Sequence, residues 1–277
     1  MIEISGTNVG IGAIDEKWLM NPVTREIVDT MRRSRSIYRF ASANQLSFRL
    51  EMGLNTVEAA RALAHSGVSF ATFYDSRCNE RFWNLTPNGG FRLKAGVRPA
   101  AALNDIFRNG RMYAFECATA MVIVMYKAVL ESIGEASFNR LFSNLYLWDW
   151  EFDDDLGLSW EVPNDYFPGD VRYFDNPDVN PLHMEWQGEN VIDMGNGLFF
   201  GHGVGIRPAE AFITGLNRRR KPGADQSAYL MDEAGRPAFW HLAQFSGGRG
   251  DDGNRSTTDA VRNRYVTVTV GDSVQVY

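Results

Sequence analysis

The stretch "RMYAFECATAMVIVMYKAVL" at 111–130 decides the fold class of this chain, because a polar start precedes a long apolar run. Glu116 and Cys117 stand at its head, and the residues after them are almost all apolar. Gly110 ends the preceding segment and Gly134 follows the run, which predicts one helix that begins near Cys117. A helix that is apolar on nearly every side is buried, so we expect this helix to be the centre of the fold.

The segments around this helix predict short helices and mixed strands. The strongest hairpin signal is "ENVIDMGNGLFFGHGVGI" at 189–206, where two apolar runs flank the turn residues "GNG". We also expect helices at 55–66, 99–108 and 208–220, a hairpin that folds back at "PNGG" (87–90), and a strand at 170–174. The predicted class is α+β, a compact core with one central helix packed on a mostly antiparallel sheet.

The composition changes at about Ala234, which predicts a boundary between two regions. The segment "SGGRGDDGNRSTTD" at 246–259 is rich in glycine and polar residues, as linkers are. After it, "RYVTVTVGDSVQVY" alternates strictly around Gly271 and Asp272 and predicts a terminal β-hairpin. We therefore expect a catalytic domain at 1–234, followed at 235–277 by a linker and a hairpin extension.

Charge and composition exclude several classes of protein. The chain has 28 Lys and Arg against 34 Asp and Glu, a formal charge of −6 that gives no field for nucleic acid. No apolar run reaches the roughly 18–20 residues of a membrane helix, and the N-terminus has no secretion signal. The expectation is a protein of the cytoplasm without a nucleic-acid or membrane partner. The two cysteines, Cys78 and Cys117, are expected to be free thiols.

Cys117 has two interpretations. A cysteine in an apolar helix is often only a small hydrophobic residue. In the first turn, however, it faces unpaired N–H groups and the positive end of the helix dipole, which favour a thiolate. A nucleophile at the start of a buried helix is the papain-like arrangement. Cys78 lies in the polar loop "YDSRCNERF" and is predicted to be ordinary.

A thiol with a pKa near 8.5 needs a base, and two residues of the 189–206 hairpin are candidates. They are His202, which glycines flank, and Glu189, which begins the hairpin. If the turn has two residues, Asn196 and Gly197, the side chains of Glu189 and His202 share a face; a three-residue turn sends them to opposite faces. The sequence leaves the register open.

A carboxylate is a weak base for a thiol, because the reference pKa values differ by about 4 units, against about 2 for histidine. Glu189 works only if burial raises its pKa and the start of the helix lowers that of Cys117. Glu116 disfavours the thiolate while it is ionised, so a role for it requires the protonated form.

Several motifs occur together in one order, namely "ATFY", "YAFECATA", "YLWDW", "WQGENVI", "GHGVGI" and "QSAYL". With them, residues 1–235 resemble the bacterial spore-coat protein-glutamine gamma-glutamyltransferases, small transglutaminases with a papain-like core. The resemblance implies that Cys117 forms a thioester with a glutamine side chain, and that a lysine amine then attacks it. It also implies Glu189 as the base, Glu116 as a secondary acid and His202 as a further site residue.

The resemblance further implies a narrow channel to the thiol, with no cofactor and no metal. Its substrate-binding residues are expected to be Phe70, Trp150, Trp186 and Asn190. The implied partners are proteins that carry glutamine and lysine, with spore-coat proteins among them and the spore coat as a location. The acidic run at 153–155 lacks the alternating oxygen ligands of a calcium loop and is expected to be solvated.

Two rival functions stay open at the level of sequence. One is a cysteine amidase or peptidase on the same core, which uses water in place of the amine. The other is a coat or assembly protein without catalytic activity that kept the fold.

Overall fold

A computed structural model describes residues 1–248, 267–270 and 273–276. Helix α5 (Cys117–Ile133) is the centre of the fold, as predicted. Glu116 caps its start, and Gly134 ends it with a φ of 81°. Most of its side chains are fully buried, because the apolar residues continue around the whole helix.

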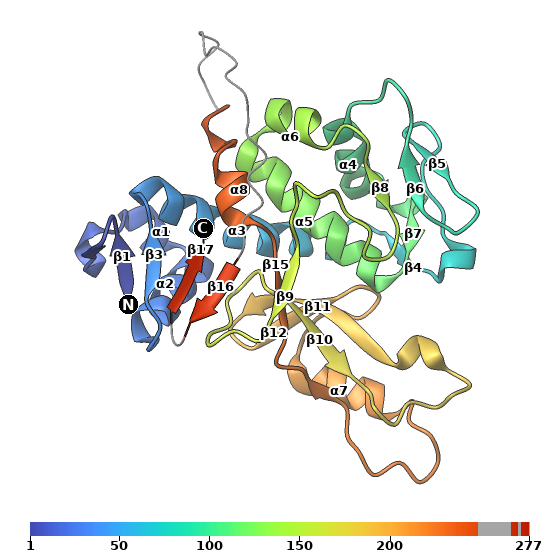
Figure 1. The fold of residues 1–277 in the computed structure, drawn as a ribbon. Helices are drawn as coiled ribbons and strands as arrows, with labels where there is room; N and C mark the ends of the chain where they lie inside the picture. The colour runs from blue at the N-terminus through green and yellow to red at the C-terminus, as the bar shows by residue number, and fades with distance from the viewer. Residues whose placement is uncertain (249–266, 271–272, 277) are drawn as a thin grey trace.

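Four helices surround α5, and the longest is α3 (Ala43–His65), which packs along it (Figure 1). The other three are α4 (Pro99–Arg108), α6 (Glu135–Leu141) and α8 (Phe239–Ala243). Helix α3 differs from the helix predicted at 55–66, because Ser42 caps it well before Asn55. Asn55 lies inside the helix and donates a hydrogen bond to Ser132 Oγ of α5 at 2.9 Å.

The main sheet is antiparallel throughout and lies against α5. Its strands follow the order β13-β12-β11-β10-β15-β9, with β14 also paired to β10. Their bounds are Gly205–Pro208 for β13, Leu198–Gly201 for β12, Gly188–Gly195 for β11, Val171–Asp175 for β10, Ala234–Arg236 for β15, Ser159–Glu161 for β9 and Tyr229–Leu230 for β14. The predicted α+β class is confirmed.

The two faces of this sheet bury different partners. One face contributes Val171, Ile192 and Phe200 to the large core around α5. The opposite face forms a smaller cluster with α7 (Ala209–Asn217), made of Phe174, Val191, Phe199, Phe212 and Leu216. Figure 1 shows α5 above the sheet and α7 below it. Successive residues of β10 and β11 therefore alternate between the helix α5 and the helix α7.

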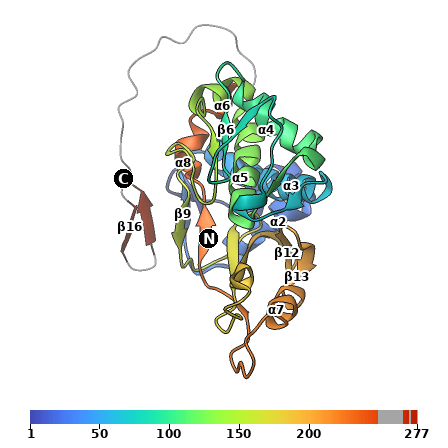
Figure 2. The same cartoon turned by 90° about the vertical axis from the view of Figure 1, so that its right-hand side faces the viewer.

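Smaller elements complete the fold, which Figure 2 shows in a view turned by 90°. The N-terminal strands β1 (Ile2–Ile4), β2 (Thr7–Asn8) and β3 (Tyr38–Phe40) form one sheet beside α1 (Glu16–Met20) and α2 (Pro22–Arg33). The predicted "PNGG" hairpin is β5 (Trp83–Leu85) with β6 (Phe91–Leu93), to which β8 (Tyr146–Leu147) adds. Strands β4 (Ser69–Phe70) and β7 (Ala114–Phe115) pair in parallel.

The predicted boundary at 234 falls inside β15, which corrects the expected start of the linker. Arg236 of β15 donates to the buried Asp170 carboxylate at 2.6 Å, and Leu242 of α8 is fully buried. Residues 235–243 thus belong to the packed core. Most of the predicted linker lies outside the described residues. At the predicted terminal hairpin, β16 (Thr267–Val270) pairs antiparallel with β17 (Ser273–Val276).

Across the described residues, no helix has the length and apolar character that a membrane crossing requires.

Candidate active site

Strand β7 leads through Glu116 directly into α5, so the backbone fixes the position of Cys117. The Glu116 carboxylate accepts hydrogen bonds from the backbone N–H groups of Ala118 at 2.8 Å and Thr119 at 2.6 Å. Both oxygens accept from the backbone, so the structure places Glu116 as the N-cap of α5. Cys117 is the first helical residue, where a backbone N–H has no acceptor within the helix.

Asn190 is the residue that contacts the sulfur atom. It lies on the α5 face of β11, and its side-chain Nδ2 donates to Cys117 Sγ at 3.4 Å. The pKa of Cys117 is raised, first by burial and then by the charges of Glu189 and Glu116, while the amide groups of Asn190 lower it. We expected the start of the helix to lower the pKa of Cys117. Burial and the two carboxylates raise it instead. The resting residue is a thiol and needs a base.

Glu189 is a buried carboxyl group on the α7 face of β11. It pairs across the sheet with Phe174, and its Oε1 has no hydrogen-bond partner among the residues that the structure describes. Burial first, and then the charge of Glu116, raises the pKa of Glu189. Cys117 and Glu189 thus influence each other's protonation, and the carboxyl group is a stronger base than an exposed glutamate.

The register of the hairpin separates Glu189 from His202. Gly195 pairs with Leu198 across a two-residue turn, but Asp193 pairs with Phe199, so Met194 is an extra residue in a β-bulge. The bulge moves the register by one residue, as a three-residue turn does. His202 therefore lies on the α5 face of the sheet, while Glu189 lies on the other.

His202 supports the backbone that precedes the thiol. Its Nε2 is 3.1 Å from the Phe115 carbonyl oxygen and 3.3 Å from that of Ser69, so this nitrogen carries the hydrogen. The ring stacks on Phe115 at 4.9 Å. Burial lowers the pKa of His202 to about 4, which keeps the ring neutral at pH 7. The structure places His202 as a fixed donor that joins β12 to β4 and β7.

The three predicted aromatic residues lie on three different segments. Phe70 of β4 is 43% exposed, and its ring lies 6.1 Å from that of His202. Trp150 packs edge-on against Trp160 at 5.1 Å. Trp186 lies three residues before Glu189, with the guanidinium of Arg219 4.7 Å above its ring. The structure thus places Phe70 beside His202. Trp150 instead packs on Trp160, and Trp186 packs under Arg219.

Tyr173 is a residue of this site that the sequence analysis missed. It pairs directly with Asn190 across β10 and β11, so both side chains lie on the α5 face. Burial, then Asp175, Cys117 and Glu189, raise the pKa of Tyr173 to about 12. A Cβ atom at Gly188 would lie 2.1 Å from its hydroxyl oxygen, so that glycine makes room for the ring. The signal that could have identified Tyr173 is the strand pattern of "DVRYF" at 170–174, in which alternate residues share a face.

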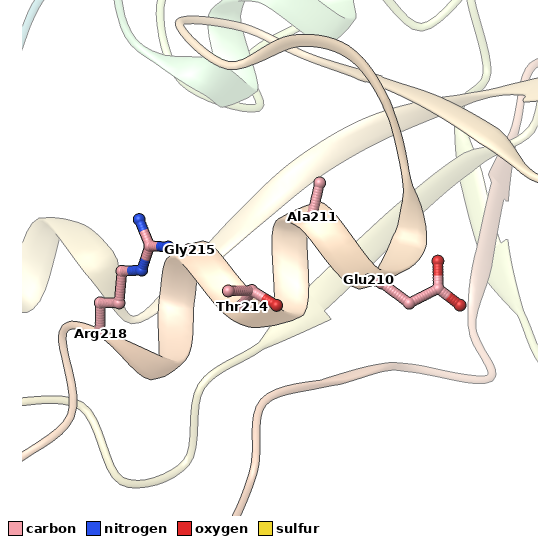
Figure 3. Close-up of a pocket in the computed structure, with 5 residues that line it drawn as sticks. All are labelled: Glu210, Ala211, Thr214, Gly215 and Arg218. Carbon is pink, nitrogen blue, oxygen red and sulfur yellow. The ribbon is translucent and has the colours of Figure 1, made fainter.

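The other acidic residues and histidines of the described residues do not form a metal site. None of their His, Cys, Asp and Glu side chains cluster in the groups of three that a metal ion needs. Asp155 of the acidic run pairs with His241 at 2.7 Å. A hollow on the outer face of α7 shares no residue with the thiol site (Figure 3). Its lining residues are Glu210, Ala211, Thr214, Gly215 and Arg218.

Gly201→Ala is expected to disturb Glu189 without touching the thiol. A Cβ atom at this position would lie 2.9 Å from Glu189 Oε1 and 2.6 Å from Phe212 Cε1. We expect a stability loss of about 1–3 kcal/mol and a larger loss of turnover than the melting curve explains. The matched control is Gly215→Ala on α7, where a Cβ atom meets nothing within 4 Å. Equal turnover in the two variants at a temperature where both are folded would contradict this prediction.

The sequences of known proteins match this chain along most of its length. A family model described as protein-glutamine gamma-glutamyltransferase matches residues 1–246. A protein of that name from Bacillus mycoides (strain KBAB4) is 42% identical over 257 residues, 91% of each chain. Another from Bacillus cereus (strain 03BB102) is 47% identical over 208 residues, 75% of each chain.

A solved structure extends the agreement to three dimensions. It is a transglutaminase from Geobacillus stearothermophilus without its C-terminal extension, 51% identical to this chain with a TM-score of 0.71. The match covers 73% of this chain and 97% of that one. The predicted enzyme class, an acyltransferase, is confirmed by the family model and the relatives. The chain therefore belongs to the protein-glutamine gamma-glutamyltransferase family.

Proposed function

We propose that this transferase joins two proteins through a thioester on Cys117, with Glu189 as the group that carries the proton. A glutamine carboxamide of one protein is the acyl donor, and a lysine amine of another is the acceptor. The products are an isopeptide bond and ammonia.

The observation that carries this proposal is the pairing of a protonated thiol with a buried, unusually basic carboxyl group. The pKa of Cys117 is raised in part by the charge of Glu189, so the two groups are electrostatic neighbours. Glu189 also has an oxygen without a partner among the described residues, which leaves a free acceptor. The pKa values of both groups are raised, so Glu189 is a stronger base than an exposed glutamate beside a thiol that needs one.

The reaction then follows from these groups. As Sγ attacks the carboxamide carbon, Glu189 accepts the thiol proton and delivers it to the leaving ammonia. The Asn190 side chain, which donates to Sγ at 3.4 Å, and the Cys117 N–H at the helix start are the donors that we assign to the oxygen on which negative charge develops. In the second half, Glu189 takes a proton from the attacking amine, and the thiolate leaves and regains it.

The experiment compares amine incorporation with hydrolysis. The protein is incubated with a glutamine-bearing protein and a fluorescent primary amine, and both bound fluorescence and free ammonia are measured. Ammonia with a matching amount of incorporated amine supports the transferase. Ammonia without incorporation supports the amidase alternative, and neither product supports a coat protein without catalytic activity.

We extend the proposal to spore-coat proteins as substrates and to the spore coat as the location after synthesis in the cytoplasm. The support is the motif resemblance to spore-coat transglutaminases. We also propose that the reaction needs no calcium. Undiminished amine incorporation in excess EDTA supports that statement, and recovery only after calcium is added overturns it.

A further inference from the structure

A tight turn at 148–151 rests on the first turn of α5. The backbone N–H of Asp149 donates to Thr119 Oγ1 at 2.9 Å, and Thr119 is buried. Thr119 follows Cys117 by two residues, which is ~3 Å along the helix axis and about 200° around it. The N–H of Thr119 is already held by Glu116. One side chain therefore links the capped start of α5 to this turn.

The turn carries local costs that its surroundings must offset. Asp149 has a φ of 49°, a left-handed conformation that residues other than glycine rarely adopt. The indole N–H of Trp148 is buried without a partner among the described residues. Such conformations persist only when neighbouring contacts hold them, and they concentrate at functional sites. The hydrogen bond to Thr119 is the polar contact that ties the strained residue to the helix.

The turn presents two aromatic side chains on either side of the strained residue. Trp148 lies 5.6 Å from the ring of Phe73, and Trp150 lies 5.1 Å from the ring of Trp160. The Trp148 carbonyl accepts from the N–H of Glu151 at 2.9 Å, which closes the turn. A shift of Asp149 would therefore move both indoles relative to the thiol.

We propose that Thr119 is a positioning residue that holds the turn 148–151 over the start of α5 and thereby limits the access of water to the thioester. This inference rests on the proposed function. A thioester that waits for a lysine amine is lost if water reaches it first, so exclusion of water sets the ratio of aminolysis to hydrolysis. Thr119 makes no contact with the reacting atoms.

The test compares Thr119→Val with Thr119→Ser in the full chain. Valine keeps the shape of threonine but removes the acceptor, and serine keeps the acceptor. The readouts are incorporated fluorescent amine and total ammonia, with hydrolysis as their difference. Loss of one hydrogen bond is expected to lower the ratio of aminolysis to hydrolysis about threefold to tenfold in Thr119→Val. Thr119→Ser is expected to keep the wild-type ratio.

If the melting curve shows that the valine variant does not fold, Thr119→Ala is used instead, because it also lacks the hydroxyl acceptor. An unchanged ratio in a folded valine or alanine variant overturns the inference, even when both rates fall together. A lowered ratio in Thr119→Ser as well assigns the effect to packing and also overturns it. If the wild-type protein yields neither product, the proposed function has failed, which is a separate outcome.

Discussion

Cys117→Ala is expected to reduce amine incorporation to the level measured without enzyme, a loss of at least about 10³-fold. No other group of the described site replaces the sulfur as the atom that carries the acyl group. The change removes a single atom from a partly buried side chain, so the cost in stability is expected to stay below about 1 kcal/mol. The measurement is the incorporation of a fluorescent amine, beside a thermal melting curve.

Cys78→Ala is the matched control, because it changes the same atom in the other thiol. Burial raises the pKa of Cys78 to about 11, with Glu80 adding to the rise and Lys94 opposing it. Both thiols are thus protonated at rest, and the buried Glu189 acts on Cys117. Cys78→Ala is expected to keep full activity. Loss of activity in Cys78→Ala, or its survival in Cys117→Ala, would mean that the nucleophile was assigned wrongly.

The central helix was predictable because its signals are local. The apolar run, Glu116 before it and Gly134 after it are all within one segment, and nothing distant competes with them. Helix α3 shows the opposite case. The pair Ser42 and Gln45 has the spacing of a capping box, and so does the pair Asn55 and Glu58 inside the helix. Asn55 is satisfied by Ser132 of α5, a tertiary contact that local spacing does not reveal.

The candidate residues of the site could be named from the sequence, but their arrangement could not. The sequence pointed to Cys117, Glu189 and His202, yet the faces of Glu189 and His202 depend on a bulge at Met194. A single extra residue such as Met194, between Asp193 and Gly195, has no clear sequence signal of its own. The sign of the pKa change at Cys117 depended in the same way on burial, which only the packed fold determines.

Glu189→Gln is expected to lower turnover by about 10²–10⁴-fold, the usual contribution of a positioned general base. Glutamine has nearly the shape of glutamate, so the thiol, Asn190 and Gly201 keep their places. What disappears is the group that accepts the thiol proton. The loss is expected in both the ammonia and the amine readouts, since Glu189 moves a proton in each half of the reaction.

The same substitution is expected to stabilise the fold, and increasingly so as the pH rises. The folded pKa of Glu189 is raised above its unfolded value, first by burial and then by the charge of Glu116. The stability that this group contributes is therefore complete below the unfolded pKa and is lost as the pH rises through the folded pKa. A glutamine side chain carries no charge at any pH, so Glu189→Gln avoids that loss. We expect a gain of roughly 3 °C or more in melting temperature at pH 8 and little gain at pH 5.

Glu185→Gln is the control for both readouts. Glu185 lies four residues away and is exposed. Its pKa is lowered, first by its own backbone N–H; burial opposes this, and His183 adds to the lowering. Its substitution is expected to keep turnover and to give no gain in stability at high pH. A buried base that ionises lowers the free energy of unfolding. A neutral residue at the same position restores that stability. If Glu189→Gln melts no higher than wild type at pH 8, Glu189 is not the buried base with a raised pKa on which this mechanism depends.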